Sequence, residues 1–107
     1  MQGEAEFRGA AEAAIEALKQ HLIARGEHAE AGFEVEEQGG ALNVLFEQRG
    51  DKFTIAPNLA MRQIWITAPA TSMKLDWGET TRQFILPRTG EGLIALVDRL
   101  VDEHRER

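Results

Sequence analysis

The apolar positions of this chain follow a helical period near its N-terminal end. Between Phe7 and Leu22, apolar side chains recur three and four residues apart, so they form one stripe along a helix. Several of the residues between them are alanines, which favour helix formation. The pattern predicts a helix from about Glu4 to Arg25 that ends at Gly26.

A second helical stripe lies near the C-terminal end, between Leu93 and Val101. Pro87 ends the segment before it, Thr89 is able to cap a helix N-terminus, and Glu91 places a negative charge in the first turn. We therefore expect a second helix that begins directly after Thr89.

The residues between these helices form short runs rich in β-branched and aromatic side chains. Turn signals separate the runs, such as the Gly-Gly pair at 39–40 and the Arg-Gly-Asp turn at 49–51. The segment that starts at Pro57 is expected to be a loop. The expected strands are residues 33–37, 41–48, 52–56, 62–69, 73–77 and 82–86.

The order of these elements decides the fold class. No helix lies between the strands, which excludes a parallel sheet built from βαβ units. The simplest arrangement packs the N- and C-terminal helices on one face of an antiparallel β-sheet and leaves the other face to solvent. We therefore expect an α+β fold, a two-layer α/β sandwich, formed by a single domain over residues 1–107.

Trp65 stands on the polar face of its expected strand. Strand alternation places Ile64 and Ile66 on one face and Gln63, Trp65 and Thr67 on the other. If the isoleucines face the core, Trp65 is exposed to solvent, where a large aromatic side chain serves as an interface anchor. The alternative is that a loop or a neighbouring side chain covers the indole.

Composition excludes several classes of function. The net charge is −6 and the sequence contains no cysteine, which argues against nucleic-acid binding and against disulfides, thiolate metal sites and cysteine nucleophiles. The sequence has no apolar run long enough for a membrane span and no signal peptide, so we expect a cytoplasmic protein. We also expect it to act as a monomer. It also lacks the motifs of hydrolases, phosphate-binding loops and dinucleotide sites.

The stretch QIWITAPATSMKLDW, from Gln63 to Trp77, resembles the frataxin family. Frataxins carry a Gln-Ile/Val-Trp strand, a bend that contains serine and proline, and then Asp-Trp on the next strand. The spacing between Trp65 and Trp77 matches this pattern, as do the GGALNV turn and strand and the TGEG stretch before the last helix. The resemblance covers nearly the whole chain.

The resemblance implies the frataxin sandwich and a role in iron–sulfur cluster assembly. Frataxins bind the complex of cysteine desulfurase and scaffold protein and modulate sulfur transfer. Gln63 and Trp65 match family contact residues, Lys74 matches a basic position that faces the same partners, and Trp77 matches a core or rim aromatic. The departure is Ala56, which stands where the family has an asparagine that helps to hold the scaffold. The expected contact residues are Asn43, Gln63, Trp65, Thr67, Lys74 and Trp77.

Frataxins also bind iron weakly, through an acidic ridge on the first helix and first strand. Glu12, Glu16 and Glu34 match acidic positions of that ridge. Its distal half is replaced here by Lys19, Gln20, Ile23 and Ala24, so we expect iron binding to be weak. The histidines, His21, His28 and His104, have no metal-ligand spacing.

Three functions remain open at this point. The first is a regulatory binding protein of iron–sulfur cluster assembly, without catalytic residues or an organic cofactor. The second is an iron-handling protein, either a chaperone or a ferroxidase, and only a ferroxidase would be an enzyme. The third is a frataxin-fold interaction module with another partner. Glu12, Glu16 and Glu34 give the second function only weak support. Trp65 supports the first and the third equally, and the Gln-Trp and Asp-Trp spacing favours the first.

Overall fold

The structure is a computed structural model that describes residues 3–27, 31–47 and 50–105. The described residues form two helices, α1 (Glu4–Gly26) and α2 (Leu93–Arg105), and six strands. The strands are β1 (Phe33–Gln38), β2 (Ala41–Phe46), β3 (Lys52–Asn58), β4 (Gln63–Thr67), β5 (Ser72–Gly78) and β6 (Gln83–Ile85). The expected Arg-Gly-Asp turn includes Arg49, which lies outside the described residues.

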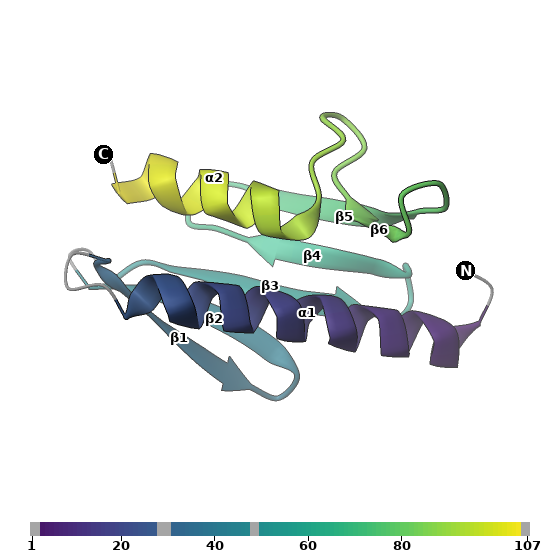
Figure 1. Ribbon diagram of the computed structural model, residues 1–107, viewed down its shortest axis with the longest axis horizontal. Coiled ribbons are helices and arrows are strands. Elements are labelled where there is room, and N and C mark those ends of the chain that lie inside the picture. The colour runs from purple at the N-terminus through teal and green to yellow at the C-terminus, as the bar shows by residue number, and fades with distance from the viewer. Residues whose placement is uncertain (1–2, 28–30, 48–49, 106–107) are drawn as a thin grey trace.

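The strands form one antiparallel sheet in which each strand pairs with its neighbour in the chain. Figure 1 shows α1 and α2 lying side by side across the same face of this sheet. The expected α+β sandwich, with helices on one face of an antiparallel sheet, is therefore confirmed.

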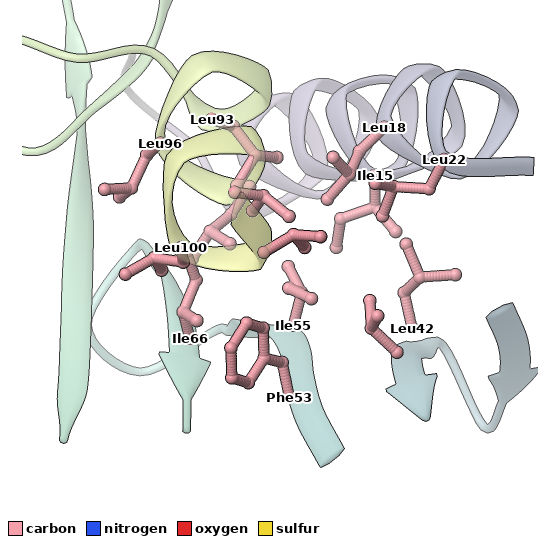
Figure 2. Close-up of a cluster of buried hydrophobic side chains, with 14 of the residues drawn as sticks. Ile15, Leu18, Leu22, Leu42, Phe53, Ile55, Ile66, Leu93, Leu96 and Leu100 are labelled. Carbon is pink, nitrogen blue, oxygen red and sulfur yellow. The ribbon is translucent and has the colours of Figure 1, made fainter. Parts of the chain in front are cut away.

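The core lies between the helices and this face of the sheet. Figure 2 shows apolar side chains that meet there from α1, α2 and the central strands, among them Ile15, Leu18, Leu22, Leu42, Ile55, Ile66, Leu93, Leu96 and Leu100. Full burial of one such side chain is worth about 1.5–3 kcal/mol. A shift of one residue in the register of a strand would move all its apolar side chains to the solvent face. Burial of the core therefore also determines which side chains face away from the helices.

The expectation of a loop at Pro57 is wrong. β3 continues through Pro57 to Asn58, and Pro57 pairs with Ile64 of β4. The pairing between β2 and β3 extends no further along β3 than Ile55. Beyond that point β3 is an edge strand on its β2 side, which is the setting in which a sheet tolerates proline.

The expected N-cap of α2 is also wrong. The helix begins at Leu93, and the carbonyl of Gly92 accepts its first hydrogen bond, from the Leu96 amide at 2.9 Å. The Thr89 hydroxyl instead accepts the Glu91 amide proton at 3.2 Å and donates to the Glu91 carboxylate at 2.8 Å. Thr89 therefore closes a turn before the helix, a role that its side chain fills as readily as a cap.

The contribution of Glu91 to the stability of this turn depends on pH. Arg99 donates two hydrogen bonds to its carboxylate, at 2.7 and 2.8 Å, and Arg99 and Thr89 together lower the pKa of Glu91 from 4.5 to about 2. Because the folded pKa lies below the unfolded one, the contribution to stability is complete above pH 4.5 and is lost as the pH falls toward 2.

We expect the variant Glu91→Gln to be less stable than the original chain at pH 7, and the difference to shrink steadily between pH 4.5 and pH 2. Urea unfolding at a series of pH values measures both proteins. A difference that stays constant across that interval would show that the Glu91 charge does not contribute.

Candidate partner-binding surface

The face of the sheet turned away from the helices carries most of the expected contact residues. Strand register brings them into neighbouring rows: Asn43 pairs with Thr54, Thr54 with Thr67, and Trp65 with Lys74. We call this surface the open sheet face and define it by Asn43, Thr54, Gln63, Trp65, Thr67 and Lys74.

Trp65 is partly exposed on this face. Its neighbour on β3 is Ala56, which has a small side chain. Ile64 and Ile66, which precede and follow Trp65 in β4, are buried on the other face of the sheet. The Lys74 ammonium lies 4.8 Å from the centroid of the Trp65 ring, a cation–π contact of about 0.5–1 kcal/mol at an exposed site. The expectation of a largely exposed Trp65 therefore needs correction, because a neighbouring side chain covers part of the ring.

The indole edge is held by hydrogen bonds. Trp65 Nε1 donates to Gln63 Oε1 at 2.9 Å, and Gln63 Nε2 donates to Asp76 Oδ1 at 2.8 Å. Asp76 is a member of this cluster that the sequence analysis did not include. The signal was available, since Asp76 stands two residues after Lys74 and therefore shares its face of β5.

The two remaining expected contacts on this face differ in accessibility. Asn43 is only 8% exposed, and its Oδ1 accepts a hydrogen bond from the Thr54 hydroxyl at 2.8 Å. It therefore forms part of the floor of the surface. Thr67 is exposed at the end of β4, opposite Ser72.

Trp77 lies on the opposite face of the sheet. It pairs with Phe84 on β6, and their ring centroids are 5.2 Å apart in an edge-to-face arrangement. Both rings line a groove of about 610 Å³ between the N-terminal halves of α1 and α2, together with small residues such as Ala14. The structure thus separates Trp77 from the other expected contact residues and places it at the rim of the core.

The expected acidic ridge is not assembled as the sequence analysis placed it. Glu12 and Glu16 are exposed on α1, but Glu34 pairs with Leu45 on the side of β1 that faces away from the helices. Lys19 of α1 instead pairs with two carboxylates: its ammonium lies 4.0 Å from Glu16 on α1 and 3.1 Å from Glu37 on β1.

Lys19 occupies the place that a cation would need. Its hydrogen bond to Glu37, with the negative charge of Glu16, raises its pKa, so it stays protonated. Among the described residues, no group of three or more histidine, aspartate and glutamate side chains is arranged to hold a metal ion.

Two of the histidines lie close to carboxylates from distant parts of the chain. His21 Nε2 lies 2.8 Å from Asp98, which links α1 to α2, and His104 Nε2 lies 3.3 Å from Asp51. His28 lies outside the described residues. Within the part of the chain that the structure covers, neither helix is long and apolar enough to cross a membrane.

Comparison with known proteins places the chain in one family. A family model described as a frataxin-like domain matches residues 2–107. The chain is 29% identical over 70 residues to the iron–sulfur cluster assembly protein CyaY of Stutzerimonas stutzeri strain A1501. That alignment covers 65% of this chain and 63% of the relative, which is just under two thirds of the relative's length.

A solved structure supports the fold independently. Frataxin from Psychromonas ingrahamii matches with a TM-score of 0.73, covering 99% of this chain and 94% of that one, at 16% sequence identity. At this identity the likeness concerns the fold alone.

Proposed function

Because this chain belongs to the frataxin family, we propose that it is an accessory protein of iron–sulfur cluster assembly, which docks on the complex of a cysteine desulfurase and its scaffold protein and modulates sulfur transfer. The observation that carries the proposal is Trp65, a partly exposed tryptophan on the open sheet face, flanked by Gln63 and Lys74 as in the family pattern. The name of the CyaY relative supports the same pathway.

The chemistry of the open sheet face suits a protein partner. Aromatic side chains at the centre of a patch, with polar and charged groups around them, are typical of interface anchors. The Trp65 indole proton is already bonded to Gln63, so the face offers an aromatic surface and the Lys74 ammonium. A matching partner would present an apolar group to the ring and a carboxylate or carbonyl oxygen to Lys74.

The proposal is tested by the rate of sulfide release. Purified desulfurase and scaffold from the source cell are given cysteine and a reductant, with and without this protein. We expect a saturable change in rate, in either direction, that the variant Trp65→Ala does not produce. A variant on the other face, Ile94→Ala, serves as control and should act as the original chain does, because Ile94 lines the groove between the helices. A rate unaffected at any concentration would contradict the proposal.

We propose that the protein binds iron only weakly, at the surface of α1. Glu12 and Glu16 supply carboxylates there, but the Lys19 ammonium competes for the same position. We therefore do not favour an iron chaperone or ferroxidase, since such a protein needs several oxygen ligands around one cation.

Replacing Lys19 by glutamate should tighten Fe²⁺ binding. The change removes a competing cation and adds a carboxylate beside Glu16 and Glu37, which is worth roughly 1 kcal/mol, or about fivefold in affinity, at moderate ionic strength. Anaerobic titration followed by amide shifts measures the affinity. The matched charge reversal Lys52→Glu, at the exposed first residue of β3, should leave the affinity unchanged. Equal affinities in all three proteins would place the iron contact elsewhere.

A further inference from the structure

The hydrogen bonds beside Trp65 run in one direction across three side chains. Trp65 Nε1 donates to Gln63 Oε1 at 2.9 Å, and Gln63 Nε2 donates to Asp76 Oδ1 at 2.8 Å. An indole is only a donor and an ionised carboxylate is only an acceptor, whereas an amide is both. The amide of Gln63 therefore satisfies both neighbours in one orientation, with its oxygen toward Trp65 and its nitrogen toward Asp76.

We propose that Asp76 is a positioning residue for the docking surface: through Gln63, its carboxylate sets the orientation of the Trp65 indole that the partner meets. The inference rests on the proposed function and deepens it. Asp76 acts on the partner through Trp65 and does not need to touch the partner itself.

The strand register places Asp76 where its carboxylate can accept a hydrogen bond from Gln63. Ile64 pairs with Leu75, so Gln63 and Asp76 are the next residues along β4 and β5 and lie opposite each other on the same face. Gln63 and Asp76 are both partly buried, which shields their hydrogen bond from competing water. Asp76 also pairs with Ile85 of β6, which fixes its strand from the other side.

The held orientation matters for binding because the hydrogen bond from Nε1 to Gln63 fixes the direction of the indole edge. Ala56 pairs with Trp65 on β3, and the Lys74 ammonium lies 4.8 Å from the ring centroid, so neither supplies the acceptor that Nε1 needs. An anchor that is already oriented loses less conformational entropy on binding than one that must be ordered. Removal of Asp76 should therefore weaken binding although the ring itself is unchanged.

The first test uses the free protein and needs no partner. Indole N–H signals in a ¹H–¹⁵N spectrum are assigned with Trp77→Phe. We expect the Trp65 indole proton to exchange with solvent several-fold faster in Asp76→Ala than in the original chain. Asp76→Asn should lie between them, since its amide is an acceptor that is also able to donate. The control Glu36→Ala removes an exposed charge from β1 and should change nothing. Unchanged exchange and shift in Asp76→Ala would overturn the inference.

The second test measures affinity for the desulfurase and scaffold complex. Asp76→Ala should weaken binding roughly fivefold in the original chain and have no effect in a Trp65→Ala background, as a double-mutant cycle shows for two residues that act as one unit. If Asp76→Ala weakens binding equally in the original chain and in the Trp65→Ala variant, Asp76 does not act through Trp65 and contacts the partner directly. If Trp65→Ala binds as tightly as the original chain, the proposed docking face is wrong, while the exchange measurement still decides the role of Asp76.

Discussion

Replacing Trp65 by alanine is expected to weaken binding to the desulfurase and scaffold complex by at least tenfold. The residue combines the features of an interface anchor: an aromatic ring at the centre of the open sheet face, held at its edge by Gln63 and covered in part by Lys74. Truncation of such an anchor costs about 2 kcal/mol or more of binding free energy. Titration calorimetry or surface-based binding with the purified complex gives the ratio of dissociation constants.

The same substitution should change stability little. Trp65 points away from the core cluster, and the substitution removes its contact with the exposed Lys74 and its hydrogen bond to Gln63. We expect the free energy of unfolding to fall by no more than about 1 kcal/mol. A large fall in stability together with unchanged affinity would mean that Trp65 is a structural residue.

Replacing Trp77 by alanine is expected to have the opposite effects. Its ring packs edge-to-face on Phe84 and against the core on the helix side of the sheet. Truncation of a buried tryptophan costs about 3–5 kcal/mol, and Trp77 is only partly buried, so we expect a loss of about 2–3 kcal/mol. Denaturant unfolding measures this loss.

Affinity for the partner should stay unchanged in Trp77→Ala at a temperature where the variant is folded. Trp77 lies on the opposite face from Trp65, so it has no place in a contact made by the open sheet face. The control Trp77→Phe keeps an aromatic ring and should recover most of the stability. Weaker binding by both Trp77 variants would show that the partner also uses the groove between the helices.

The period of the apolar residues was sufficient to predict the fold. Helical stripes and alternating runs identified α1, α2 and the strands, and the absence of a helix between strands implied the antiparallel sheet. The errors occurred where one local signal had two physical outcomes. Thr89 has a side chain that caps a helix or closes a turn, and Pro57 breaks a central strand but not an edge.

For the candidate site, the sequence predicted which face of its own strand each side chain occupies, but not which side chains on neighbouring strands are in contact. Alternation placed Trp65 and Gln63 on the outer face, and the same rule applied to residues 73–77 places Trp77 with Leu75 on the core side. Contacts between strands required the register, which the sequence did not supply. The approach of Lys74 to the Trp65 ring and of Gln63 to Asp76 both depend on how β5 pairs with β4.

The acidic residues illustrate the same limit. Glu34 was expected in the acidic ridge, but the direction of its side chain depends on which face of β1 packs against α1. The structure turns Glu37 toward the helix, where Lys19 neutralises it. Carboxylates that look clustered in the sequence are therefore divided between the two faces of the sheet.

A map of the contact surface tests most directly whether the partner docks on the open sheet face. The ¹⁵N-labelled protein is titrated with the unlabelled desulfurase and scaffold complex, and loss of amide and indole signals is followed residue by residue. We expect signals of the open sheet face to weaken first, led by Gln63, Trp65 and Lys74, while those of Ala14, Trp77 and Ile94 in the groove between the helices persist. Selective loss of the groove signals, or no change at saturating concentrations of the complex, would contradict this expectation.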